Sequence, residues 1–212
     1  MDIYPNYDTI PNMKKLTSLF TLLTAVMITA AANATSACDM YGTVPGINPF
    51  MGTHQNQIAV NVGSGVNSGF LIPPPTQWVP FFMLPNIQYS QPTTFFSLPA
   101  RQSLNFGETI GMGKKYGWDW TDFTIPMVWA SGDLALLYGR DWYFGPGVGV
   151  GFQGKENDRL GAKLVFQFKI SGGYRFNDAW GMELFVQHFS NGNTAEENHS
   201  YAFYGAGVTY SF

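Results

Sequence analysis

His188 and Ser190 stand two residues apart in a segment, 179–190, whose apolar and polar residues alternate. In an extended strand, side chains two residues apart point to the same face. A hydroxyl beside a basic imidazole is the minimum equipment for nucleophilic acyl transfer. The same face carries the apolar side chains of Trp180, Met182, Leu184 and Val186. The pair would therefore meet a lipid ester; alternatively, the strand has left the hydrocarbon by residue 188, and both are interfacial polar residues without a role.

The elements that must position this pair are predicted to be strands. Apolar and polar residues alternate with a period of two along the chain, and no convincing helical periodicity of apolar residues is seen. Three strands are clear, at 164–176, 179–190 and 201–212. Five more are expected at about 55–63, 80–90, 102–115, 127–138 and 142–153. The total of eight is even, as bacterial membrane barrels require.

The connections between these strands alternate in length, as periplasmic turns and outer loops do. Tight turns are expected at 139–141 and 177–178, and longer connections at 64–79, 116–126, 154–162 and 191–200. The connection at 91–100 is too long for a tight periplasmic turn, and the pattern gives no reason for it.

The composition agrees with a membrane barrel. Charged residues make up 12% of the 212 residues and aromatic residues 17%, with 24 glycines. Past the N-terminus no apolar run approaches the ~20 residues of a transmembrane helix. In a barrel only every second residue meets lipid, so apolar residues are spread thinly. The predicted fold is all-β, an eight-stranded antiparallel transmembrane β-barrel; a soluble β-sandwich is the alternative. The net charge of −3 gives no sign of a nucleic-acid partner.

The N-terminus has the features of an export signal. A basic Met13-Lys14-Lys15 precedes an apolar stretch at 16–31, and Ala32-Asn33-Ala34 and Thr35-Ser36-Ala37 are cleavage patterns. We expect an N-terminal extension and signal peptide at 1–37, a periplasmic lead-in at 38–54 and an outer-membrane β-barrel at 55–212. Lipidation of Cys38 is left open.

The C-terminus supports the same location. The chain ends at Phe212 with Tyr210 two residues before it, and a terminal aromatic on an amphipathic strand resembles the sorting signal of outer-membrane barrels. The predicted location is the cell outer membrane of a Gram-negative bacterium. With both termini periplasmic, the loop at 191–200 is extracellular, and His188 and Ser190 lie near the outer leaflet.

The run His188-Phe189-Ser190-Asn191, followed by Asn198 and a final strand that ends at Phe212, resembles the lipid A 3-O-deacylases, the PagL family of acyloxyacyl hydrolase-like barrels. The segment from Gly145 to Phe176 is also similar, and further upstream only the architecture is shared. The His-x-Ser-Asn element is fairly specific at the end of a penultimate barrel strand and weak as a bare string.

The resemblance implies a Ser–His–Glu esterase that hydrolyses the 3-position acyl ester of lipid A and releases a 3-hydroxy fatty acid. Ser190 would be the nucleophile and His188 its general base. Asn198 corresponds to a family Asn associated with the oxyanion hole, where a donor contributes about 3 kcal/mol in other hydrolases. Asn191 is expected to fix the turn.

One departure from the family concerns the third member of the triad. The position that carries the family Glu is Ala202 here. A carboxylate orients the imidazole and supports its protonated form. Glu196 and Glu197 are nearby substitutes, and Glu197 is predicted to fold back to His188; alternatively, both are solvated loop charges. Glu108 is a third candidate, for which we expect a bulge that turns it inward.

Two further functions stay open. The first alternative is a non-catalytic small barrel with a degenerate site. The second is another lipid-acting barrel, such as an acyltransferase or phospholipase, and that barrel should show an acyl-sized cavity in the lumen. His54, His188 and His199 form no recognisable ligand spacing, so neither a metal nor another cofactor is expected. The expected partners are lipid A or lipopolysaccharide and the outer membrane; a homodimer and the preferred acyl length are left open.

Overall fold

The computed structural model describes residues 47–66, 78–111, 123–157, 159–196 and 198–212, and these residues form one antiparallel sheet. Its strands are β1 (Gln57–Val66), β2 (Trp78–Phe95), β3 (Leu98–Gly111), β4 (Phe123–Leu134), β5 (Leu137–Tyr138), β6 (Trp142–Gln153), β7 (Leu164–Arg175), β8 (Trp180–Ser190) and β9 (Tyr201–Ser211). The described residues include no helix that is long and apolar enough to cross a membrane.

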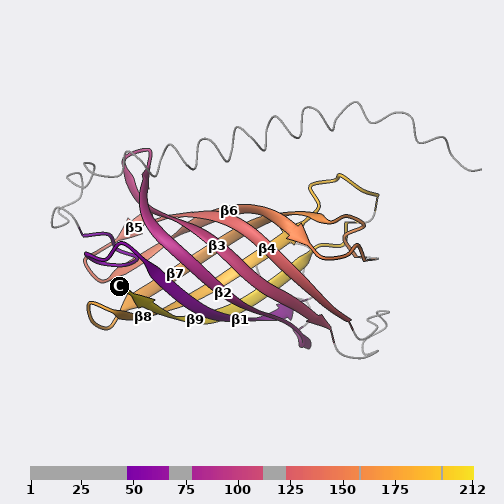
Figure 1. The fold of residues 1–212 in the computed structure, drawn as a ribbon, viewed down its shortest axis with the longest axis horizontal. Coiled ribbons are helices and arrows are strands. Elements are labelled where there is room, and N and C mark those ends of the chain that lie inside the picture. Colours follow the sequence, from indigo (N-terminus) through magenta and orange to yellow (C-terminus); the bar gives the residue numbers. More distant parts are fainter. Residues whose placement is uncertain (1–46, 67–77, 112–122, 158, 197) are drawn as a thin grey trace, which may run out of the picture.

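The sheet closes into a barrel (Figure 1). Each long strand pairs with its neighbours in sequence, β1 also pairs with β9, and β4 pairs with β6 to complete the circle. The two-residue β5 pairs with β6 alone and lies outside this circle. Eight long strands therefore form the wall, which confirms the predicted fold class. We call the end that holds Gln57 and Phe212 the base end and the opposite end the loop end.

Alternation along each strand separates an apolar outer face from an inner face that carries the buried polar and charged side chains. In β1, Val60 and Val62 are exposed on the outer face, whereas Gln57 and Asn61 are buried in the lumen. The glycines of β6 face inward, and a Cβ at Gly147 would overlap the Asp133 carboxylate. A soluble sandwich would bury the apolar face instead, so this distribution matches a wall that faces hydrocarbon.

Several strand limits differ from those predicted. The expected connection at 91–100 is a hairpin, because β2 and β3 continue to Phe95 and Leu98 and only two residues join them. The expected strand at 127–138 begins earlier, at Phe123, and ends at Leu134, after which β5 turns away to pair with β6. Parts of the expected loops at 64–79 and 116–126, and most of the N-terminal segment, lie outside the described residues.

The lumen is filled by side chains in three layers. At the base end, Phe50 and Met51 of the lead-in pack with Ala135 and Tyr143. At the loop end, an apolar cluster comprises Phe82, Leu84, Met127, Trp129, Leu160, Val165, Phe189, Tyr201 and Phe203. Between them lie buried charged residues, and these side chains argue against the acyl-sized lumen cavity expected of an acyltransferase or phospholipase.

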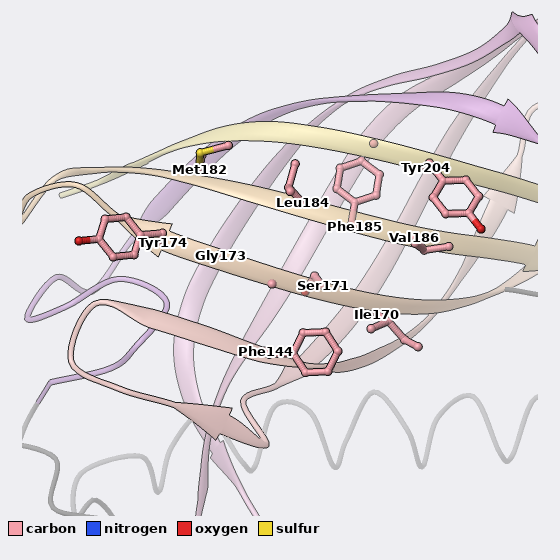
Figure 2. A pocket seen from close by; sticks show the side chains of 12 residues that line it. Phe144, Ile170, Ser171, Gly173, Tyr174, Met182, Leu184, Phe185, Val186 and Tyr204 are labelled. Atoms are coloured by element: carbon pink, nitrogen blue, oxygen red, sulfur yellow. The ribbon is translucent and has the colours of Figure 1, made fainter. Parts of the chain in front are cut away.

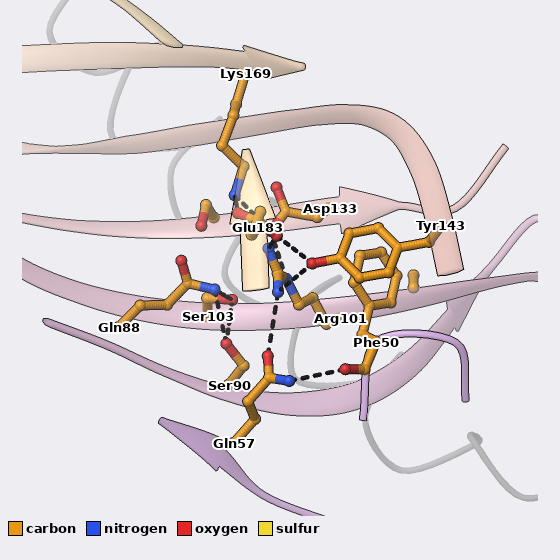
Figure 3. Close-up of polar contacts among 12 residues, drawn as sticks. Phe50, Gln57, Gln88, Ser90, Arg101, Ser103, Asp133, Tyr143, Lys169 and Glu183 are labelled. Atoms are coloured by element: carbon orange, nitrogen blue, oxygen red, sulfur yellow. Dashed lines mark hydrogen bonds and ion pairs between the residues drawn. The ribbon is translucent and has the colours of Figure 1, made fainter. Parts of the chain in front are cut away.

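The charged layer is a network of ion pairs centred on Arg101 (Figure 3). Arg101 Nε donates to Asp133 Oδ2 at 2.8 Å, and its Nη2 donates to Glu183. Lys169 Nζ donates to the same two carboxylates, at 3.0 and 3.3 Å. The Tyr143 hydroxyl also donates to Glu183. Two cations thus face two anions inside the barrel, which offsets the cost of burying each charge.

The lead-in is tied to this network from the base end. Arg101 Nη1 donates to Gln57 Oε1 at 3.1 Å, and Gln57 Nε2 donates to the Phe50 carbonyl at 2.8 Å. The Arg101 guanidinium also lies 4.7 Å from the centre of the Phe50 ring. Residues 47–56 therefore belong to the packed structure of the base end.

Candidate functional site at the loop end of β8

His188 and Ser190 lie at the loop end of β8 and point outward. Burial alternates along the strand, with Glu183, Phe185, Gln187 and Phe189 buried inside and the residues between them more exposed. Phe189 packs edge-on against Trp129 in the lumen, with ring centres 5.3 Å apart. Because Phe189 points into the lumen, its neighbours His188 and Ser190 must point to the outer wall. Each of these two side chains is half-buried.

The imidazole of His188 has apolar neighbours on both flanking strands. Phe168 of β7 and Ala202 of β9 are its partners in the sheet register. Its Nδ1 is buried and has no hydrogen-bond partner in the described part of the chain. Among those residues, then, no carboxylate orients the ring, and Ala202 occupies the cross-strand position from which one would reach it.

The three carboxylates proposed as substitutes differ in their placement. Glu197 lies outside the described residues, and Glu196 is exposed in the loop that follows β8. Glu108 is exposed on β3 opposite Pro126, so the expected inward bulge is wrong. β3 is also four strands from β8 in either direction around the wall. Glu108 therefore cannot orient His188.

The loop 191–200 is built around two asparagines. Asn191 Nδ2 donates to the Leu160 carbonyl at 2.6 Å, and its Oδ1 accepts from the Asn193 amide at 2.8 Å. Asn198 Oδ1 accepts from the Asn191 amide at 3.3 Å, and its Nδ2 donates to Asn193 Oδ1 at 2.9 Å. Asn191 thus holds the turn, and an oxyanion would have to use the second Nδ2 hydrogen of Asn198.

Arg159, which no sequence pattern singles out, joins the loop between β6 and β7 to the loop between β8 and β9. Its Nε donates to the Ser200 carbonyl at 2.9 Å and its Nη2 to the His199 carbonyl at 3.1 Å. The His199 amide donates in return to the Arg159 carbonyl at 2.8 Å. Burial lowers the pKa of Arg159 to about 10, so the guanidinium is still charged at neutral pH. Ser200 has a positive φ of 54°, and these bonds hold the strained step that leads into β9.

An apolar groove of about 680 Å³ runs along the outer wall below the pair (Figure 2). Its walls are side chains of β6 to β9, chiefly Phe144, Ile170, Tyr174, Met182, Leu184, Val186 and Tyr204. Gly172 lies between Phe144 and Leu184 in the register and leaves the floor without a side chain. The groove begins at Val186, two residues from His188, and extends toward the base end.

The closed wall has an apolar outside, buried polar and charged side chains inside, and exposed aromatic side chains near the base end. These features define a transmembrane β-barrel of the outer-membrane type. Residues 113–211 match the family model of the lipid A 3-O-deacylases, PagL. The resemblance that the His-x-Ser-Asn element suggested is thus confirmed for this part of the chain. The described residues contain no group of three or more His, Cys, Asp or Glu that could hold a metal ion.

Two solved structures share the fold. The crystal structure of the outer membrane enzyme PagL is 16% identical, with a TM-score of 0.53; the match covers 74% of this chain and 99% of that one. Neisserial surface protein A is 13% identical, with a TM-score of 0.50, over 74% of this chain and 97% of that one. No curated protein sequence matches this chain. At these identities the two structures establish the barrel architecture, and the family match supports a lipid A deacylase-like function.

Proposed function

We propose that the protein is a serine esterase that hydrolyses the 3-position acyl ester of lipid A, with Ser190 as nucleophile and His188 as general base. The observation that carries the proposal is the outward placement of both side chains at the loop end of β8. A reactive pair on the outer wall is accessible to a membrane lipid. A site for a soluble substrate would instead lie in the lumen or on the loops.

The groove supports a lipid substrate. The groove is apolar and lies on the same face of the sheet as His188. It starts at the cross-strand pair Val186 and Tyr204, which is two residues from the pair His188 and Ala202. From His188 to Met182 the strand rises about 20 Å, which gives a hydrocarbon chain room to lie along the wall. An ester whose acyl chain fills this groove has its carbonyl near the level of Ser190.

The chemistry follows the order of a serine hydrolase. His188 takes the proton of the Ser190 hydroxyl as the oxygen attacks the ester carbonyl, and the Asn198 amide donates to the oxyanion. The sugar oxygen leaves with the proton that His188 returns. Water, deprotonated by His188, then attacks the acyl-serine and releases the 3-hydroxy fatty acid, which restores Ser190.

The orienting carboxylate is the open element of this proposal. Glu197 is our candidate, because it follows Ser190 by a single loop and precedes Asn198 directly. A His–Ser pair without a carboxylate would be slower by several powers of ten. We place the protein in the outer membrane, with its site at the outer leaflet, after export by the signal peptide within residues 1–37.

The second candidate is a non-catalytic barrel with a degenerate site. The specific observation that favours it is the placement of Ala202 opposite His188, where a triad carboxylate would lie. Under this reading the His–Ser pair is a remnant, and the groove is merely a depression left by Gly172.

Lipid A from cells that express the protein separates the two candidates. Mass spectrometry should show the loss of one hydroxyacyl group with the parent and no loss with Ser190→Ala. Thr124→Ala, which removes an exposed outward hydroxyl at the loop end of β4, is the matched control and should behave as the parent. Identical lipid A with the parent and with Ser190→Ala, both folded in the membrane, would favour the non-catalytic barrel.

A further inference from the structure

The hairpin between β2 and β3 runs past the end of the barrel wall. Ser90 is the last residue of β2 that pairs with β1, opposite Gln57, whereas β2 continues to Phe95. The five residues beyond Ser90 add about 17 Å of strand. By comparison, the base-end turn between β7 and β8 comprises only residues 176–179. We call residues 91–100 the base hairpin.

The tip of the base hairpin exposes two aromatic rings. Phe96 is 83% exposed and Phe95 44%, and the rings meet edge to face with centres 4.5 Å apart. Phe96 and Ser97 both have positive φ, at 50° and 64°. A two-residue turn of this kind favours Asn-Gly, and a bulky residue there is strained. The turn thus presents a phenylalanine at a position where polar or small residues are usual.

The base hairpin also lacks charge. No Asp, Glu, Lys or Arg occurs between Leu84 and Ala100. A loop that reaches into water normally carries polar or charged residues. An exposed pair of aromatic rings in water is unfavourable and marks a surface that interacts with an apolar partner. The composition therefore points to a surrounding that is at least partly apolar.

The position of the base hairpin indicates that this apolar environment is the membrane. It bends away from the wall and projects sideways at the base end, near β5 (Figure 1). Exposed aromatic residues mark the same end of the barrel: Tyr89, Trp142, Tyr174, Phe176, Trp180, Tyr210 and Phe212. Such rings form the girdle that places a barrel at the membrane–water interface. The hairpin tip lies beside this girdle and outside the wall.

We propose that the base hairpin is a lateral lipid anchor whose Phe95 and Phe96 rings insert into the phospholipid interface of the leaflet at the base end. Uncharged aromatic side chains favour this layer, where an apolar ring meets hydrocarbon and the backbone stays hydrated. The anchor extends the girdle beyond the wall on the side of β2 and β3. It does not depend on any activity of His188 and Ser190, and a non-catalytic barrel would carry it equally.

Spin-label accessibility in vesicles tests the anchor. Phe96→Cys, in a Cys38→Ser background, is labelled with a nitroxide and reconstituted in vesicles of phosphatidylethanolamine and phosphatidylglycerol. Asp178→Cys, in the exposed turn at the same end, reports the aqueous phase, and Leu184→Cys on the outer wall reports hydrocarbon. The ratio of collisions with oxygen to collisions with a water-soluble nickel chelate should be several-fold higher at 96 than at 178.

Two results would overturn the proposal. A ratio at 96 equal to that at 178 would place the tip in water. Spin–spin broadening between labels at 96 that disappears on dilution with unlabelled protein would show that a second copy covers the tip instead. Each labelled barrel is first checked for folding by its shifted migration on unheated gels, so that a misfolded variant is not counted as either result.

Discussion

Ala202 lies directly opposite His188 in the antiparallel register of β8 and β9. Opposite residues in such a pair have Cβ atoms about 5 Å apart, so a longer acidic side chain at 202 would reach the imidazole. An acid at position 202 would therefore complete the Ser–His–acid arrangement that the proposed function calls for, and this chain has alanine there. The consequences of this relationship can be measured.

Ala202→Glu should increase esterase activity. A carboxylate opposite His188 would fix the tautomer and support the imidazolium, an effect worth up to about 10⁴-fold in other serine hydrolases. We expect at least about a tenfold rise in fatty acid released from lipid A by purified protein in detergent. Ala206→Glu, also outward on β9 but opposite Leu184, is the control and should give no rise. No increase with a folded Ala202→Glu barrel would mean that ring orientation does not limit the rate.

Arg159→Met should loosen the loop 191–200. The variant loses charged hydrogen bonds to the carbonyls of Ser200 and His199, which typically contribute about 1.5–3 kcal/mol each. Hydrogen–deuterium exchange should therefore accelerate in peptides that span the loop and stay unchanged at the base end. Lys163→Met removes an exposed cation near the same loops and is the control. Unchanged exchange in the loop would show that other contacts hold it.

Arg101→Met should destabilise the barrel without touching the candidate site. It leaves Asp133 and Glu183 buried with Lys169 as the remaining cation, and breaking such a buried arrangement costs about 3–5 kcal/mol. The free energy of unfolding in urea and detergent micelles measures the loss. Lys155→Met, which removes an exposed loop cation, should change it little. A loss below about 1 kcal/mol would show that the network is not a determinant of stability.

The strand pattern could be predicted from the sequence because burial follows period-2 alternation. Counting alone puts His188 and Ser190 on the outer wall, and the same alternation puts Lys169, Glu183 and Gln187 on the opposite, inward face. The partners of those residues could not be predicted in this way. Arg101 and Glu183 are 82 positions apart, and only barrel closure brings them together. The bonds of Arg159 to Ser200 and His199 likewise join two loops, across sequence separations of 41 and 40 positions.

Glu108 shows that the cost of a lipid-facing charge depends on its depth in the membrane. Simple alternation puts this residue on the outer face, whereas the cost of a charge in lipid favours a bulge that turns it inward. The cost is greatest at the bilayer midplane and falls toward the interfaces. Glu108 lies three residues from the end of β3, at the loop end, where the carboxylate can reach water. Alternation alone was correct here.

The central claim is that Ser190 is a nucleophile activated by His188 on the outer wall. The most direct test is the mass of the protein after treatment with a long-chain alkyl fluorophosphonate, followed by mapping of the modified peptide. We predict a single phosphonyl adduct on Ser190, absent from Ser190→Ala and strongly reduced in His188→Ala. An unmodified Ser190 in the folded parent, or equal modification in His188→Ala, would contradict the claim.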